Sequence, residues 1–208
     1  DMADACDTIK VARGTYFPDE GLGYINNSRD SSFRISDSVI VLGGYEGITG
    51  DTLAQRNWIC NKTILSGDID QNSDTSNNSY HVVITKQVSS GTFIDGFNIT
   101  GGNANGSLFN ELGGGWLNDG SAFFISEGPI IRNCVISKNY AFNVGGGMYS
   151  LASSPQLTNC IISGNRSGTS STGRGGGWFS LGGSPKFTNC IVSGNLSLSG
   201  GGMYNEVS

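Results

Sequence analysis

The second half of the chain repeats two short phrases at a nearly fixed spacing. Gly-Gly-Gly-Met-Tyr-Ser at 145–150 returns as Gly-Gly-Gly-Trp-Phe-Ser at 175–180 and as Gly-Gly-Gly-Met-Tyr-Asn at 200–205. The phrase Ser-Pro-Gln-Leu-Thr-Asn-Cys-Ile-Ile-Ser-Gly-Asn at 154–165 returns as Ser-Pro-Lys-Phe-Thr-Asn-Cys-Ile-Val-Ser-Gly-Asn at 184–195. From the triplet to the closing asparagine each unit spans 20 residues, and length changes are confined to the spacer that follows. Such a period predicts a solenoid of stacked units with its insertions at one corner.

The composition of the repeats selects one kind of solenoid. The units hold short β-rich runs, such as 160–162 and 190–192, bounded by Gly, Ser, Pro and Asn. No amphipathic helical pattern is present, which excludes helical solenoids. Leucine-rich repeats are unlikely, because the repeated apolar positions are not leucine. A β-propeller is also unlikely, because each blade needs about 40 or more residues, more than one repeat of this chain provides. We therefore predict an all-β, single-stranded parallel β-helix with coils about 4.8 Å apart, in which roughly seven coils make a rod on the order of 35 Å long.

The repeated phrases also carry a family resemblance. Gly-Gly-Gly-Met/Trp and Cys-Ile/Val-Ile/Val-Ser-Gly-Asn resemble the repeats of bacterial right-handed parallel β-helix proteins, and within these the polymorphic outer membrane protein type of autotransporter passenger. The chain departs from that pattern, because Gly replaces Ala in the first motif and Cys often replaces Phe in the second. The phrases at 8–16, 41–45 and 64–70 resemble a leader of large secreted bacterial β-helix proteins. The resemblance implies a right-handed β-helix and a secreted or surface location, and it implies little about activity.

The first half reads as a less regular part of the same solenoid. Residues 95–103 align with 133–139, and 63–68 read as an earlier copy of the same phrase. We expect one domain over 1–208, with irregular N-terminal coils and long loops at 1–110 and regular repeats at 111–208. The last coil is incomplete in the sequence, so we expect either a longer protein or an open end that stacks head to tail into a filament.

The charge balance excludes some classes of partner. Charged residues make up 14% of the chain and the net charge is −5, without a basic cluster. This argues against binding to nucleic acid or to an anionic membrane surface. No apolar run approaches the 18 residues of a transmembrane helix. No signal peptide is visible, and a chain that opens Asp-Met-Ala-Asp indicates a processed product of a secreted bacterial protein.

The five cysteines fall into two groups. Cys134, Cys160 and Cys190 occupy one repeat position, so we expect a buried ladder of free thiols, with metal binding as the alternative. Cys6 and Cys60 are the disulfide candidates, which would tie the first coil to a long loop in an oxidising compartment.

Strand alternation predicts which side chains line the core. If Cys160 and Ile162 point inward, Val135, Ile161 and Ile191 form an outward column. If Trp116, Met148, Trp178 and Met203 fill the core, the outward column is Leu117, Tyr149, Phe179 and Tyr204. Two interpretations of these apolar columns remain open: a loop or terminal segment covers them, or they dock another protein or a glycan. The opposite parity of the Met-Tyr strand would bury the second column instead.

Two columns of asparagine are expected at the corners of the coils. Asn139, Asn165 and Asn195 close the repeated phrase, and Asn103 is the expected match in an earlier copy. An amide side chain tolerates a left-handed turn and can bond along the stack, so we assign these residues a structural role. The second column is Asn133, Asn159 and Asn189.

Catalytic chemistry is hard to assemble from this sequence. A pectate-lyase-like site needs clustered Asp residues, Ca²⁺ and a basic residue, and glycoside hydrolysis needs two carboxylates about 5 to 9.5 Å apart. The only histidine is His81, within a strand-like run, and no acidic pair shares a repeat position. We therefore assign no catalytic residue.

One loop carries oxygen ligands at alternating positions. Asp68, Asp70, Asn72 and Asp74 partly match the start of a calcium-binding loop, although the later Gly and Glu of an EF-hand are missing. A structural Ca²⁺ and a solvated loop between coils are the two alternatives, and no other cofactor is expected.

These observations favour a secreted or cell-surface bacterial β-helix with a structural or adhesive role, in which self-association end to end is an option. The alternative is a carbohydrate-active β-helix enzyme, a polysaccharide lyase or hydrolase, or a glycan-binding module. An ice-binding solenoid is disfavoured because no regular Thr-x-Thr ladder occurs. The expected partner is a surface protein, a glycan or a second copy of the chain.

Overall fold

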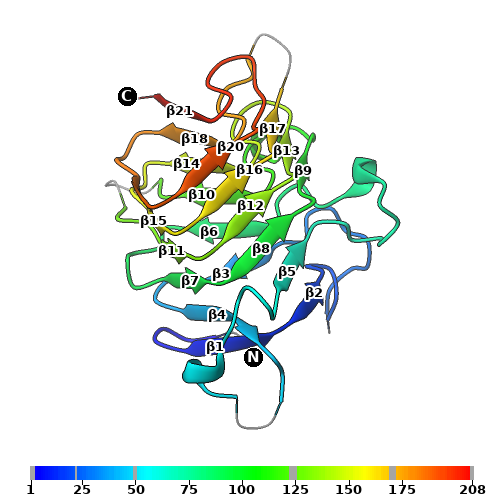
Figure 1. Cartoon of the computed structure of the whole chain (residues 1–208). Helices are drawn as coiled ribbons and strands as arrows, with labels where there is room; N and C mark the ends of the chain where they lie inside the picture. The colour runs from blue at the N-terminus through cyan, green and yellow to red at the C-terminus, as the bar shows by residue number, and fades with distance from the viewer. Residues whose placement is uncertain (1–2, 22, 49–50, 122–125, 169–171, 207–208) are drawn as a thin grey trace.

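The computed structural model describes residues 3–21, 23–48, 51–121, 126–168 and 172–206. It is all-β apart from three short 3-10 helices, and its strands pair in parallel within stacked sheets (Figure 1). The rungs rise from the N-terminus at one end of the molecule to the C-terminus at the other, which supports the β-helix predicted from the repeats.

Three sheets of six strands each form the walls of the solenoid. Sheet A holds β1 (Thr8–Ala12), β4 (Ile40–Tyr45), β7 (Phe93–Asp95), β11 (Ile130–Arg132), β15 (Gln156–Thr158) and β19 (Lys186–Thr188). Sheet B holds β2 (Gly14–Tyr16), β5 (Thr63–Ser66), β8 (Phe97–Thr100), β12 (Val135–Ser137), β16 (Ile161–Ser163) and β20 (Ile191–Ser193). Sheet C holds β3 (Phe33–Ile35), β6 (Val83–Lys86), β10 (Trp116–Asp119), β14 (Met148–Leu151), β18 (Trp178–Leu181) and β21 (Met203–Glu206).

A fourth, smaller sheet runs along one corner of three successive coils, between sheets B and C. It contains β9 (Asn103–Ala104), β13 (Tyr140–Ala141) and β17 (Arg166–Ser167). The 3-10 helices η1 (Leu53–Gln55), η2 (Thr75–Asn77) and η3 (Leu108–Glu111) lie in the connecting loops. One strand from each of sheets A, B and C makes one coil, so the described strands form six coils where the sequence suggested roughly seven.

The structure decides which side of the repeated strands faces the core, a choice that the sequence left open. Trp116 pairs with Met148, Met148 with Trp178 and Trp178 with Met203 across sheet C. These side chains enter one core cluster with Cys160 and Ile162, and the first three are 0% exposed. The interior of the solenoid is therefore filled by the repeated apolar positions.

The thiol ladder is part of this core. Cys134 and Cys160 are buried and Cys190 is half-buried, and all three are free. Burial raises the pKa of the Cys134 thiol well above its usual range and raises the pKa of Cys160 to about 12. Both thiols are therefore protonated at neutral pH and act as small apolar side chains.

The Cys6–Cys60 disulfide prediction is wrong for this structure, in which both residues are free and exposed. The Cys6 amide donates to the Ser38 carbonyl (2.8 Å), just before β4 begins. Cys60 lies in a turn whose Asn57 amide donates to the Gly44 carbonyl (2.9 Å), near the end of β4. Six residues of extended chain separate Ser38 from Gly44, roughly 20 Å, whereas a disulfide needs Cα atoms within about 7 Å.

The corners are held by a buried asparagine ladder. The Asn139 amide and its Nδ2 both donate to Asn165 Oδ1 (3.1 and 3.0 Å), and Asn165 bonds to Asn195 Oδ1 in the same way (2.9 and 3.0 Å). One coil earlier the matching position is Gly102, whose amide donates to Asn139 Oδ1 (2.9 Å), so the expected match to Asn103 is wrong by one residue. The adjacent glycine triplet is packed just as tightly, because a Cβ on Gly146 would overlap the Arg166 carbonyl oxygen.

Within the described part of the chain, no helix has the length and apolar character needed to cross a membrane.

Candidate functional site

The outward column of sheet C begins two coils earlier than the repeats suggested. Arg34 pairs with Ile84 and Ile84 with Leu117, which continues the column toward the C-terminus. The full column is Arg34, Ile84, Leu117, Tyr149, Phe179 and Tyr204.

The upper part of this column is not an open docking strip. Leu117, Tyr149 and Phe179 are 8%, 5% and 4% exposed. They form a second apolar cluster with Val144, and half-buried Leu112, Leu151, Leu181 and Tyr204 pack against it. The rings of Tyr149 and Phe179 stack at 5.7 Å, and those of Phe179 and Tyr204 at 5.6 Å. These side chains therefore form a second buried apolar cluster that stabilises the outer face of sheet C.

The outward column of sheet B is the more accessible one. Val135 is half-buried, whereas Ile161 is 37% and Ile191 58% exposed. Their register is continuous through β12, β16 and β20. These three side chains remain surface contact candidates.

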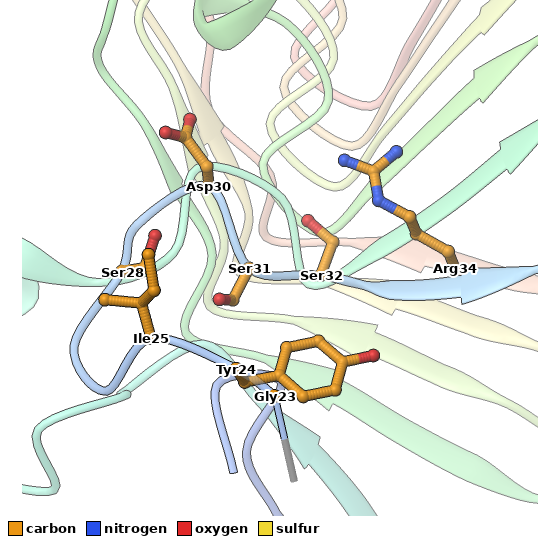
Figure 2. Close-up of a pocket in the computed structure, with 8 residues that line it drawn as sticks. All are labelled: Gly23, Tyr24, Ile25, Ser28, Asp30, Ser31, Ser32 and Arg34. Atoms are coloured by element: carbon orange, nitrogen blue, oxygen red, sulfur yellow. The ribbon is translucent and has the colours of Figure 1, made fainter. Parts of the chain in front are cut away.

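At its N-terminal end the sheet C column opens into a cleft made of two adjoining hollows, which share Asp30 and Arg34. The larger hollow has a volume of about 410 Å³ and the smaller about 220 Å³. The larger one is lined by Asp30, Arg34, His81, Ile84, Lys86, Phe109, Asn110, Leu117, Asp119 and Ser121. The smaller one is lined by Gly23, Tyr24, Ile25, Ser28, Asp30, Ser31, Ser32 and Arg34 (Figure 2).

The cleft combines an apolar floor with polar and aromatic walls. Ile84 and Leu117 belong to the floor, because they are the outward residues of β6 and β10. Phe109 projects from η3 and is 59% exposed, and Tyr24 in the smaller hollow is 58% exposed. Figure 2 shows the Asp30, Ser32 and Arg34 side chains extending to one side of the chain, opposite the Tyr24 ring.

Charges of both signs border the cleft. Lys86 and Asp119 pair in register at the ends of β6 and β10 and line one side. Asp30 and Arg34 lie where the two hollows meet. A ligand here therefore meets two cations, two carboxylates and an apolar floor, which suits a neutral or mixed polar molecule better than a highly charged one.

His81 lines the larger hollow but is held as a structural group. It is 4% exposed, its Nδ1 donates to the Gly113 carbonyl (3.0 Å) and its Nε2 lies 3.3 Å from Asn110 Oδ1. Burial lowers the pKa of His81 below its usual value, so the imidazole is neutral at pH 7. It positions the η3 loop and the glycine turn beside the cleft.

The predicted calcium residues are only partly brought together. Asp68 Oδ2 accepts from the Ser73 amide (3.2 Å), and Asp70 contacts Asn72. Asp74 is exposed and instead caps η2, where it accepts from the Ser76 amide (2.9 Å). Among the described residues, no three His, Cys, Asp or Glu side chains are grouped so that they could hold a metal ion.

Sequence reasoning missed the cleft. Tyr24, Asp30 and Phe109 lie in irregular loops, where no repeat period signals their position. Arg34 could have been found, because the register of β3 places it in the outward column. Aligning residues 33–35 with the later strands of sheet C would have identified Arg34 as an outward residue.

No family model matches the chain, and comparison with curated proteins and with solved structures finds no match either. The similarity to polymorphic outer membrane protein repeats therefore rests on the sequence phrases alone.

Proposed function

We propose that the chain belongs to a secreted or cell-surface bacterial protein, a right-handed parallel β-helix with a structural and adhesive role. In this proposal, the cleft on the outer face of sheet C binds a carbohydrate chain. The observation that carries it is the combination of an apolar floor, at Ile84 and Leu117, with exposed rings at Phe109 and Tyr24.

Sugar chemistry explains why this combination favours a glycan. A pyranose ring has an apolar C–H face and a rim of hydroxyl groups. The floor and the aromatic rings can cover the apolar face, while Asp30, Arg34 and Asp119 can hydrogen-bond the hydroxyls. The larger hollow adjoins the smaller one at Asp30 and Arg34, which leaves room for more than one sugar unit.

The test is a glycan array followed by titration calorimetry with the best ligand. Phe109→Ala should weaken binding about tenfold, the equivalent of one aromatic contact. Phe142→Ala is the matched control, because Phe142 is 45% exposed and does not line the cleft. No binding across neutral and uronate-containing glycans, or equal loss in both variants, would contradict the proposal.

The same glycans separate binding from catalysis. Asp30 and Asp119 both line the larger hollow, so a carbohydrate-active enzyme is the alternative function. Release of reducing ends or of unsaturated sugars during incubation would favour that alternative. Binding without product formation supports the adhesive role.

End-to-end association is a separate component of this proposal. In the last described coil Phe187, Val192 and Met203 pack on the core but are only half-buried, whereas their neighbours Leu157, Ile162 and Trp178 are 1%, 0% and 0% exposed. A further coil stacked here, from the same chain or from a second copy, would cover them. Sedimentation of the sample used for calorimetry reports which state is present.

A further inference from the structure

Buried oxygen atoms without hydrogen-bond partners gather in one region of the described chain. Across the described residues, eight buried side-chain polar atoms have no hydrogen-bond partner. Six of the eight belong to Asp19 and to residues 68–79. The six atoms are Asp19 Oδ1, Asp68 Oδ1, Asp70 Oδ1, Asn77 Oδ1, Asn78 Oδ1 and Ser79 Oγ. A buried oxygen without a partner costs about 1–3 kcal/mol, so such a concentration indicates that a bound ion or buried water satisfies these atoms.

The chemistry of these atoms points to a cation. Five of the six are carboxylate or amide oxygens, which accept hydrogen bonds and bind hard metal ions. Arg29 reaches this region, and it bonds to the Asn78 carbonyl (2.7 Å) rather than to any of the six atoms. None of the six atoms accepts a hydrogen bond, and none takes part in a salt bridge of the described residues.

The loop itself brings two carboxylates and an amide together. Asp68 and Asp70 are separated by Ile69, which is 2% exposed and anchors the loop in the interior. Asp70 Oδ2 contacts Asn77 Nδ2, and the remaining Asp70 and Asn77 oxygens are buried and unpaired. Asp68 uses only Oδ2, which accepts from Ser73.

Asp19 approaches this loop from the neighbouring coil. Tyr16 pairs with Leu65 near the ends of β2 and β5, so Asp19 and Asp68 lie in the segments that follow two neighbouring strands. A hydrogen bond from Gln71 Nε2 to Glu20 Oε1 (2.9 Å) confirms that the two segments lie together. Asp19 is 3% exposed, its Oδ2 accepts from the Asn27 amide, and its Oδ1 has no partner.

We propose that the loop 68–79 binds a calcium ion through Asp68, Asp70 and Asn77, with Asp19 as the acidic neighbour on the adjacent coil. Since no three carboxylates are grouped tightly enough to hold an ion alone among the described residues, the ligand set is mixed. Backbone carbonyls and water complete the six to eight oxygens that Ca²⁺ requires. Asn72 and Asp74, which are exposed, are outside this set.

The test is titration calorimetry of the full chain with CaCl₂, alongside thermal unfolding in CaCl₂ and in EGTA. We expect saturable binding, weaker binding of MgCl₂, and an unfolding midpoint several degrees higher with calcium. Asp70→Asn should lower the calcium affinity at least about tenfold. Asp74→Asn is the matched control and should change the affinity less than about twofold, because Asp74 only caps η2.

A purely structural role for Asp70 gives a different pattern. If Asp70 only accepts hydrogen bonds, Asp70→Asn should lower the unfolding midpoint equally in calcium and in EGTA. If it is a ligand, the variant should lose the calcium-dependent rise and keep the midpoint of the wild type in EGTA. Absence of calcium binding by the wild-type chain, or equal losses in the two variants, would overturn the proposal and assign the orphaned oxygens to buried water. These results do not depend on carbohydrate binding.

Discussion

At the scale of single residues, His81 is the group whose burial most directly links stability to pH. Its ring is enclosed between Gly113 and Asn110, and the charge of Arg34 further opposes protonation. Burial is the main cause of its lowered pKa. The folded chain therefore holds this imidazole neutral at a pH where an unfolded chain would protonate it.

We predict that the chain loses stability on acidification below pH 6.5, the usual pKa of His81. Because the pKa of His81 is lower in the folded state, the unfolded state binds more protons than the folded state below pH 6.5. The free energy of unfolding therefore decreases as the pH is lowered. Asp37 and Asp74, whose pKa values are lowered from 3.8, stay ionised there and do not contribute. Between pH 7.5 and pH 5.5 the thermal midpoint of the wild type should fall at least about 2 °C more than that of His81→Gln. Parallel curves for the two proteins would contradict this assignment.

Single residues also show where prediction from the sequence works. Strand alternation left open which face of sheet C lies inward, but that Trp116 and Met148 share one face on successive coils was predictable, because exact repetition fixes the register. Phe109 and Asp30 were not, because they lie in loops whose conformation depends on tertiary contacts. Asn103 was misplaced because the coil before the regular repeats has a glycine, Gly102, where the later coils have an asparagine.

At the scale of elements, the corner between sheet B and the small sheet is stabilised by hydrogen bonds that run along the stack. Asn165 both accepts from Asn139 and donates to the Ile136 carbonyl (2.8 Å), and it is 1% exposed. Asn159 belongs to the second ladder, on the same coil, but is exposed and bonds Asn133 at 3.4 Å. Asn165 and Asn159 are the same residue type on the same coil and differ in burial, so substitutions at the two positions measure the effect of burial.

We predict that Asn165→Ala lowers the free energy of unfolding by about 3 kcal/mol, because it leaves buried donors and acceptors of two neighbouring coils without partners. The control is Asn159→Gly, which retains the left-handed backbone of Asn159 (φ 56°) and loses only exposed bonds. It should cost less than about 1 kcal/mol. Denaturant unfolding of both variants measures the difference, and equal losses would show that burial along the ladder does not govern corner stability.

At the scale of the whole molecule, each strand of sheets A, B and C pairs only with strands of the coils directly above and below it. Core side chains of the middle coils, such as Ile136, Met148 and Ile162, are 0% exposed. Those of the outer coils, such as Val11 and Val192, are only half-buried. In a stack of this kind, stability is close to a sum of the coils and of the interfaces between neighbours, so the outer coils have one interface fewer.

Hydrogen exchange followed by mass spectrometry should reveal this gradient. We predict that amides of β12, β14 and β16 exchange slowest, while those of β1, β2, β19 and β20 exchange at least about tenfold faster, because the outer coils can open without the middle ones. Strands of equal length in one sheet supply the internal control, since β12, β16 and β20 each have three residues, two aliphatic residues followed by a serine, at different places in the stack. If calcium binds the loop at 68–79, its addition should slow exchange there and in the adjacent first coil, while β20 at the far end stays unchanged. Uniform protection along the stack would instead mean that all six coils unfold as one cooperative unit.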